Sequence, residues 1–150
     1  MDRFRYHDRH DAGASLARSL ADFAGVADAI VLALPRGGVP VGYEVATRLC
    51  LPLDVYVVRK LGVPGHEELA MGAIAGDGSC VIDRRLLAEL DVPPASLQSV
   101  VDRELAELRR RQEAYRDGRP ERRLAGKTAI LVDDGLATGS SMYAAVRAVR

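Results

Sequence analysis

The sequence has no excess of charge of either sign. Its 150 residues contain 21 Lys and Arg against 21 Asp and Glu, so the formal net charge is zero. A neutral chain offers no broad electrostatic surface for nucleic acid or for an anionic membrane, and we expect neither partner. Any binding of phosphate must therefore come from local loops and a few cations.

Cysteine is scarce, and long apolar runs are missing. Cys50 and Cys80 belong to no CxxC pair or Cys/His cluster, which argues against zinc and predicts two reduced, partly buried thiols in a cytoplasmic protein. No apolar run approaches the roughly 20 residues that a membrane span needs. The charged start of the chain lacks the apolar core of a signal peptide.

The chain does contain an alternation of short apolar runs and helical patterns. Continuous apolar runs suit strands buried on both faces of a parallel sheet, and they occur at residues 29–34, 53–58 and 128–132. Apolar residues at helical spacing predict helices at residues 8–24, 41–49, 96–115 and 142–150. Asp83 is a candidate cap for a further short helix that ends near Leu90. Glycines around Asp77 predict a hairpin between residues 69–75 and 79–82. The pattern predicts one α/β domain over residues 1–150, with a doubly wound parallel sheet and a β-hairpin excursion.

The last predicted helix has no strand after it. A crossover helix needs a following strand to complete its right-handed unit, so we expect the C-terminal part of the fold to be missing and further strands to follow Arg150. Residues 128–132 would then form an open sheet edge. Such an edge is typically covered by a second chain, which predicts a homo-oligomer.

The most informative segment is ILVDDGLATGSSM, residues 130–142. It delivers two adjacent carboxylates, Asp133 and Asp134, to the carboxyl edge of the sheet, where open α/β folds bind ligands. Small residues and a helix start follow, which suits a phosphate monoester held by backbone N–H groups and hydroxyls. The carboxylates instead suit ribose hydroxyls or a hydrated divalent cation. A plain strand-to-helix turn with a capping Asp is the alternative, but it explains one carboxylate only.

This segment resembles the binding signature for phosphoribosyl pyrophosphate (PRPP) of type I phosphoribosyltransferases over its whole length. The differences are mild: Leu136 stands where the family usually has Val, Thr or Ile, and Ser141 where it has Thr. The resemblance implies that Asp133 and Asp134 face the ribose. It also implies a 5-phosphate loop made of Gly135, Leu136, Ala137, Thr138, Gly139, Ser140 and Ser141.

A second glycine loop ends the first predicted strand. Arg36, Gly37 and Gly38 resemble the family's pyrophosphate-binding loop, which often contains a non-proline cis peptide. Arg36 adds a planar cation suited to phosphate oxygens, although a plain turn is the alternative. We predict from the sequence that Gly37→Val weakens PRPP and pyrophosphate binding far more than ribose 5-phosphate binding.

Arg59 and Lys60 follow the second predicted strand. With Pro64 and Gly65 they resemble the segment that opens the mobile catalytic loop of adenine phosphoribosyltransferases, and they are the candidate catalytic residues. The alternative is a solvated pair of cations. His66, in the same predicted loop, is read as a surface residue rather than a base.

The resemblance implies transfer of the 5-phosphoribosyl group from PRPP to a nitrogen nucleophile such as a nucleobase, with release of pyrophosphate. Magnesium would be held by PRPP, with Asp133 and Asp134 nearby. The acceptor is not readable from the sequence. A non-catalytic PRPP-binding regulatory module is the alternative, and a magnesium-dependent phosphotransferase is a third reading that the Thr-Gly loop disfavours.

Overall fold

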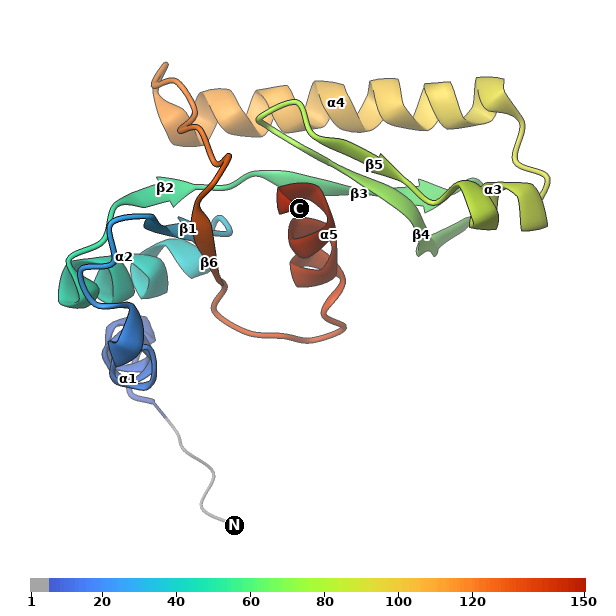
Figure 1. The fold of residues 1–150 in the computed structure, drawn as a ribbon. Helices are drawn as coiled ribbons and strands as arrows, with labels where there is room; N and C mark the ends of the chain where they lie inside the picture. The colour runs from blue at the N-terminus through green and yellow to red at the C-terminus, as the bar shows by residue number, and fades with distance from the viewer. Residues whose placement is uncertain (1–5) are drawn as a thin grey trace, which may run out of the picture. The chain divides into compact units, whose positions relative to one another are not determined.

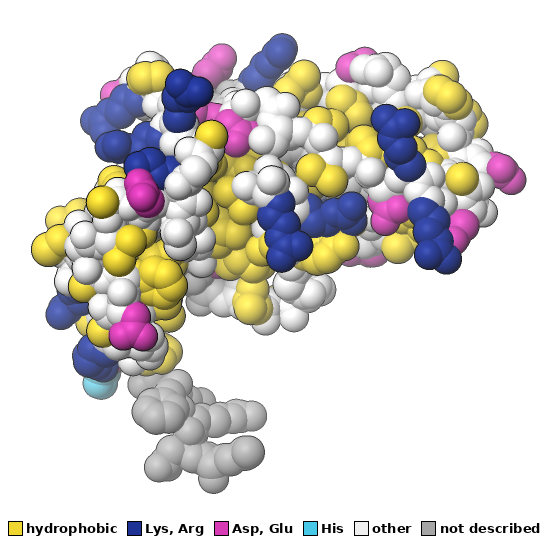
Figure 2. Space-filling view, viewed as in Figure 1, with side chains coloured by type: hydrophobic (Ala, Val, Ile, Leu, Met, Phe, Trp, Pro, Cys, Tyr) yellow, Lys and Arg dark blue, Asp and Glu magenta, His cyan; other side chains and the backbone are white. Residues whose placement is uncertain are grey.

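The computed structural model describes residues 6–150, which form two compact units (Figure 1). Within the described residues, the first unit comprises residues 6–55 and Arg122–Ala137, and the second comprises Tyr56–Glu121 and Thr138–Arg150. On the face drawn in Figure 2, acidic side chains lie beside basic ones, as the zero net charge leads one to expect. None of the described helices is long and apolar enough to cross a membrane.

The first unit is built on a three-stranded parallel sheet. Its order is β2 (Leu53–Val55), β1 (Ala29–Ala33), β6 (Thr128–Val132), so β1 is central and β6 lies at an edge of the sheet that the structure describes. Every residue of β1 is buried, as its continuous apolar run predicts. The α/β class and the parallel sheet are thus confirmed, whereas further strands after Arg150 stay a prediction.

Two helices complete the first unit. α2 (Gly38–Leu49) packs against β1, and α1 (Arg9–Ser19) packs against α2. The side chain of Asp8 caps α1 by accepting a hydrogen bond from the N–H of Asp11 at 2.8 Å. α1 ends earlier than predicted, because a 3₁₀ turn, Ala21–Phe23, follows it and Gly25 adopts a φ of +66°.

The second unit is built on a three-stranded antiparallel sheet, in the order β3 (Val58–Val63), β4 (His66–Ala75), β5 (Cys80–Ile82). The hairpin predicted around Asp77 is confirmed as β4 and β5. α4 (Pro94–Arg116) and α5 (Ser140–Val149) both pack against β3, and the short α3 (Arg84–Glu89) is capped by Asp83 as predicted. The interior of this unit is apolar and includes Leu61, Met71, Leu108 and Ala145.

Two local predictions of secondary structure and packing were wrong. The strand expected at residues 53–58 is split, because the chain leaves the parallel sheet after Val55 and re-enters an antiparallel one at Val58. The apolar stripe expected along residues 96–115 was wrong in part: of Leu97, Val101, Leu105, Leu108 and Tyr115, only Leu108 is among the buried residues of α4. The other buried residues of α4 are Val100, Glu104 and Arg116, and Glu104 is the partner of Arg59 on β3.

The cysteines also differ from expectation. Cys50 and Cys80 are free thiols, and both are exposed rather than partly buried. Cys50 follows the last turn of α2 with a φ of 54°, so it leaves the buried helix face. Cys80 begins β5, which pairs with β4 on one side only in the described sheet.

Candidate functional site

The parallel pairing of β1 and β6 brings two polar loops to one edge of the first unit. Ala33 is opposite Val132 in the register, and the N–H of Leu34 donates to the carbonyl of Val132 at 2.8 Å. The loop through Arg36 follows β1 and the acidic pair follows β6, so the two lie next to each other at this edge. The peptide bond between Pro35 and Arg36 is cis.

Two glycines allow these loops to touch. A Cβ on Gly38 would lie 2.6 Å from the carbonyl oxygen of Val132 and 3.0 Å from the Cα of Asp133. A Cβ on Gly37 would overlap the carboxyl group of Asp134. Because any side chain at either position would collide, the loop after β1 and the acidic pair form one continuous surface.

Asp134 is held by an arginine from the other end of the sequence. The Arg9 guanidinium donates from Nε at 3.0 Å and from Nη2 at 2.7 Å, both to Oδ2 of Asp134. This hydrogen-bonded ion pair holds the pKa of Asp134 below its usual range. Asp134 is therefore the member of the acidic pair that most readily stays ionised.

Asp133 has the opposite environment. Its Oδ1 accepts a hydrogen bond from the N–H of Asp134 at 2.8 Å. Partial burial, together with the neighbouring Asp134 carboxylate, raises the pKa of Asp133. The two adjacent carboxylates are thus electrostatically unequal, because the ion pair with Arg9 lowers the pKa of Asp134 while partial burial raises that of Asp133.

The loop after the acidic pair runs from one unit into the other. Gly135, Leu136 and Ala137 belong to the first unit and are exposed. In the second unit, Thr138 Oγ1 donates to Ser140 Oγ at 3.1 Å and accepts from the Ser140 N–H at 3.3 Å.

A helix begins at the end of this loop. Gly139 adopts a φ of +76° at the N-cap of α5, a conformation that favours glycine. Ser140 and Ser141 form the first turn of α5, whose N–H groups have no acceptor within the helix. This end of α5 is suited to an anion.

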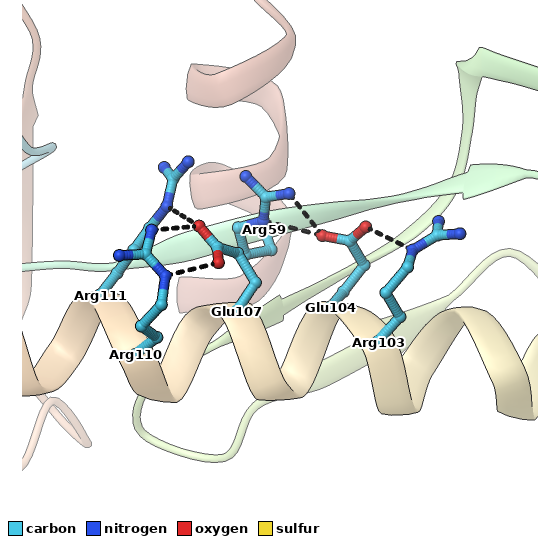
Figure 3. A network of polar contacts seen from close by, with 6 residues as sticks. All are labelled: Arg59, Arg103, Glu104, Glu107, Arg110 and Arg111. Atoms are coloured by element: carbon cyan, nitrogen blue, oxygen red, sulfur yellow. Dashed lines mark hydrogen bonds and ion pairs between the residues drawn. The ribbon is translucent and has the colours of Figure 1, made fainter.

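Arg59 and Lys60 lie in strand β3, not in the loop where we predicted them. β3 pairs with β4 around a turn at Pro64 and Gly65. Arg59 Nη2 lies 2.6 Å from Glu104 Oε2 on α4 (Figure 3), and Lys60 Nζ lies 3.3 Å from Glu68 Oε2. Both candidate catalytic cations thus have acidic partners.

The charges around Arg59 continue along α4. Arg103 lies 3.3 Å from the second oxygen of Glu104, and Glu107 accepts hydrogen bonds from Arg110 and Arg111 (Figure 3). Those two arginines lower the pKa of Glu107 to about 2. Arg110 and Arg111 are therefore paired with an acid of their own helix.

Comparison with known proteins identifies the family. A family model described as phosphoribosyl transferase domain matches residues 5–150. The chain belongs to the phosphoribosyl transferase family. Two Mycobacterium tuberculosis proteins, from strains CDC 1551 and H37Rv, are named "Putative phosphoribosyl transferase MT0597" and "Putative phosphoribosyl transferase Rv0571c". Each is 48% identical to 97% of this chain, which spans only 32% of their length.

A solved structure shares the fold. The crystal structure of the protein TT1426 from Thermus thermophilus matches with a TM-score of 0.88 and 44% sequence identity, over 97% of this chain and 69% of that one. The phosphoribosyl transferase fold predicted from the sequence is thereby confirmed.

The acidic pair of this phosphoribosyl transferase domain has oxygen atoms suited to a metal ion that is already bound to a phosphorylated substrate. Residues 6–150 contain no group of three His, Cys, Asp or Glu side chains that could hold a metal ion by themselves. Asp133 and Asp134 supply carboxylate oxygens at an accessible edge, which suits a magnesium ion whose other ligands are phosphate oxygens and water. The residues therefore fit magnesium carried by a phosphorylated substrate.

Arg9 is the site residue that sequence reasoning missed. It belongs to a charged segment at the start of the chain, and no motif connects it with Asp134, 125 positions away. Arg36, by contrast, lies where predicted, exposed at the edge beside Gly37.

Proposed function

We propose that this domain binds magnesium-PRPP and transfers its 5-phosphoribosyl group to a nitrogen nucleophile such as a nucleobase, with release of pyrophosphate. The observation that carries the proposal is the packing of Asp134 against Gly37. In PRPP the ribose hydroxyls and the pyrophosphate are attached to neighbouring carbons. A site for PRPP must therefore place hydroxyl acceptors directly beside a pyrophosphate loop, and the closeness of Asp134 to Gly37 supports that assignment here.

Each part of the ligand has a matching part of the chain. Asp133 and Asp134 would accept hydrogen bonds from the ribose hydroxyls. The backbone of Arg36, Gly37 and Gly38, with the Arg36 guanidinium, would bind pyrophosphate. The 5-phosphate would bind the loop from Gly135 to Ser141, where glycine backbone and hydroxyl donors precede the start of α5.

The proposed reaction requires little acid–base catalysis by side chains of the protein. The bond from the anomeric carbon to pyrophosphate breaks, the nucleophile's lone pair forms the new C–N bond, and the nucleophile loses its proton to solvent or a nearby base. Positive charge develops on the ribose ring, as in glycoside hydrolysis, and the two carboxylates would stabilise it. Magnesium bound with PRPP would offset the charge of the departing pyrophosphate.

A non-catalytic PRPP-binding module is the second candidate, and one observation favours it. Arg59 and Lys60, the candidate catalytic cations, are each paired with a carboxylate within the second unit. A cation that already has an acidic partner offers less charge to a leaving group. Binding without turnover would be the signature of this alternative.

Titration calorimetry with magnesium-PRPP, and a pyrophosphate-release assay with a panel of nucleobases, test the proposal. The variant Asp133→Asn with Asp134→Asn should lose PRPP binding by at least tenfold, because both hydroxyl acceptors lose their charge. Asp28→Asn is the matched control, since Asp28 is an exposed acid at the opposite end of β1.

The outcomes separate the two candidates. Binding with pyrophosphate release supports the transferase, and binding without release on any base supports the regulatory module. Equal PRPP affinity in the double variant and the wild type would overturn the site itself. A nitrogen nucleophile as the acceptor, homo-oligomerisation, a cytoplasmic location and a role in nucleotide metabolism stay predictions.

A further inference from the structure

Arg9 lies at a fixed position beside the acidic pair. It is the first residue of α1, whose start is set by the Asp8 cap. Farther along α1, Gly13 lies against α2 so closely that a Cβ there would be 2.6 Å from the Cβ of Glu44. His10 also contacts the Glu44 carboxylate at 3.1 Å. The helix that carries Arg9 is therefore anchored to the same unit that carries Asp134.

The guanidinium binds Asp134 in an asymmetric way. Nε and Nη2 both donate to Oδ2, and Oδ1 receives neither bond. The carboxyl group also lies against Gly37, where a Cβ would overlap Oδ2, the oxygen that Arg9 binds, and then Oδ1. The two hydrogen bonds from Arg9 hold Oδ2 in place, and Oδ1, which Arg9 does not bind, can accept from an incoming hydroxyl.

Arg9 also reduces the electrostatic repulsion at this edge. Two adjacent carboxylates repel each other, and both repel a ligand that carries phosphate groups. The charge of Arg9 offsets that of Asp134. A lysine would supply the charge but would lack the planar pair of donors that fixes the carboxylate orientation.

We propose that Arg9 is a positioning residue of the ribose subsite, which acts by holding Asp134 in the orientation that accepts the ribose hydroxyls. This inference rests on the proposed function. It assigns to the N-terminal helix α1 a part in substrate binding.

The affinities for three ligands distinguish this positioning role from direct pyrophosphate binding and from a general charge effect. PRPP and ribose 5-phosphate carry the ribose hydroxyls, whereas pyrophosphate does not. A residue that acts through Asp134 on the ribose should affect the first two ligands. A residue that binds pyrophosphate directly should affect PRPP and pyrophosphate, and a general charge effect should affect all three.

The test is titration calorimetry of Arg9→Met with each ligand in the presence of magnesium. We expect about a tenfold loss of affinity for PRPP and for ribose 5-phosphate, the effect of one lost charge-assisted hydrogen bond, and less than about a twofold change for pyrophosphate. Arg9→Lys should recover part of the loss. Arg18→Met, an exposed residue of the same helix, is the matched control and should bind all three ligands as the wild type does.

A double-mutant cycle completes the test. In a protein that already carries Asp134→Asn, Arg9→Met should cause little further loss of PRPP affinity, because Arg9 acts through that carboxylate. Unchanged ribose 5-phosphate affinity, equal losses for all three ligands, or additive losses in the cycle would each overturn the inference. Failure of the wild type to bind PRPP would instead overturn the proposed function, and this inference with it.

Discussion

The carboxyl group of Asp134 occupies the space that a side chain on Gly37 would need. Gly37→Ala should therefore displace Asp134 and disturb the ribose side of the site as well as the pyrophosphate loop. We expect affinity for PRPP, pyrophosphate and ribose 5-phosphate to fall by roughly tenfold or more each, since each depends on a group that must move. Calorimetry with the three ligands measures the effect, and a loss confined to PRPP and pyrophosphate would contradict it.

This expectation revises the one made from sequence. The motif alone assigns Gly37 to pyrophosphate and predicts that ribose 5-phosphate binding is spared. The structure adds the contact with Asp134, which no spacing rule contains because the two residues are far apart in the chain.

The strands and the acidic pair could be predicted from local pattern. Continuous apolar runs located β1 and β6 to within one residue, because strands buried on both faces leave that signature. The end of β2 could not be predicted in this way. Residues 53–58 look like one strand, and only the antiparallel partner β4 explains why the chain changes sheets after Val55.

The roles of charged residues were harder to predict than the strands. No motif in the sequence contains Arg9 or Glu104. Arg59 does belong to a motif, but that motif does not reveal its partner. The contacts of all three depend on packing between distant segments. Sequence reasoning placed Arg59 in a loop because Arg59 and Lys60, with Pro64 and Gly65, resemble the segment that opens the mobile loop of adenine phosphoribosyltransferases. In the structure, Pro64 and Gly65 form a turn that joins two paired strands.

Gly13→Ala should destabilise the protein, although alanine is the better helix former by about 1 kcal/mol. The new Cβ would lie 2.6 Å from the Cβ of Glu44 and 2.8 Å from the carbonyl oxygen of Val41, so α1 would have to move off α2. We expect a loss of about 1–3 kcal/mol in the free energy of unfolding. Urea denaturation checks it against Ser19→Ala, an exposed residue of α1 that should change stability by less than about 0.5 kcal/mol. A more stable Gly13→Ala would show that α1 is not tightly packed.

Tyr56→Phe should leave the protein as stable or make it more stable at neutral pH. Tyr56 is 3% exposed, and its hydroxyl has no hydrogen-bond partner within residues 6–150. Removing an unsatisfied buried hydroxyl recovers a desolvation cost of about 1 kcal/mol. Chemical denaturation measures the change, and a loss above about 1 kcal/mol would mean that the hydroxyl is bonded in solution.

The same substitution should change the response to alkali. Burial, and then the carboxylates of Asp77 and Glu121, raise the pKa of Tyr56 well above its ordinary value. The unfolded chain releases the phenolic proton near about pH 10 while the folded protein keeps it, so stability is intact below that pH and falls as pH rises. The wild type should lose up to about 1.4 kcal/mol per pH unit more than Tyr56→Phe above about pH 10. Tyr43→Phe, at an exposed tyrosine, should behave like the wild type.

The Arg59–Glu104 pair should be strongly coupled in stability. Their side chains are 29% and 11% exposed, and their closest contact is 2.6 Å. Removing either partner leaves a largely buried charge with poorer compensation, because Arg103, the other neighbour of Glu104, is mostly exposed. A double-mutant cycle of Arg59→Met and Glu104→Gln, followed by urea denaturation, should give a coupling energy of about 1–3 kcal/mol.

The matched control for that cycle is the Arg85–Glu89 pair, which joins the same two residue types at 2.9 Å but is 89% and 56% exposed. Water and salt screen such a pair, so the same cycle there should give no more than about 0.5 kcal/mol. If the two pairs gave equal coupling energies, Glu104 would not be desolvated by β3. Arg59 would then be no more tightly held than a surface cation, and its pairing would cease to favour the non-catalytic alternative. A large difference would mean that Arg59 stabilises the second unit through its pairing with Glu104.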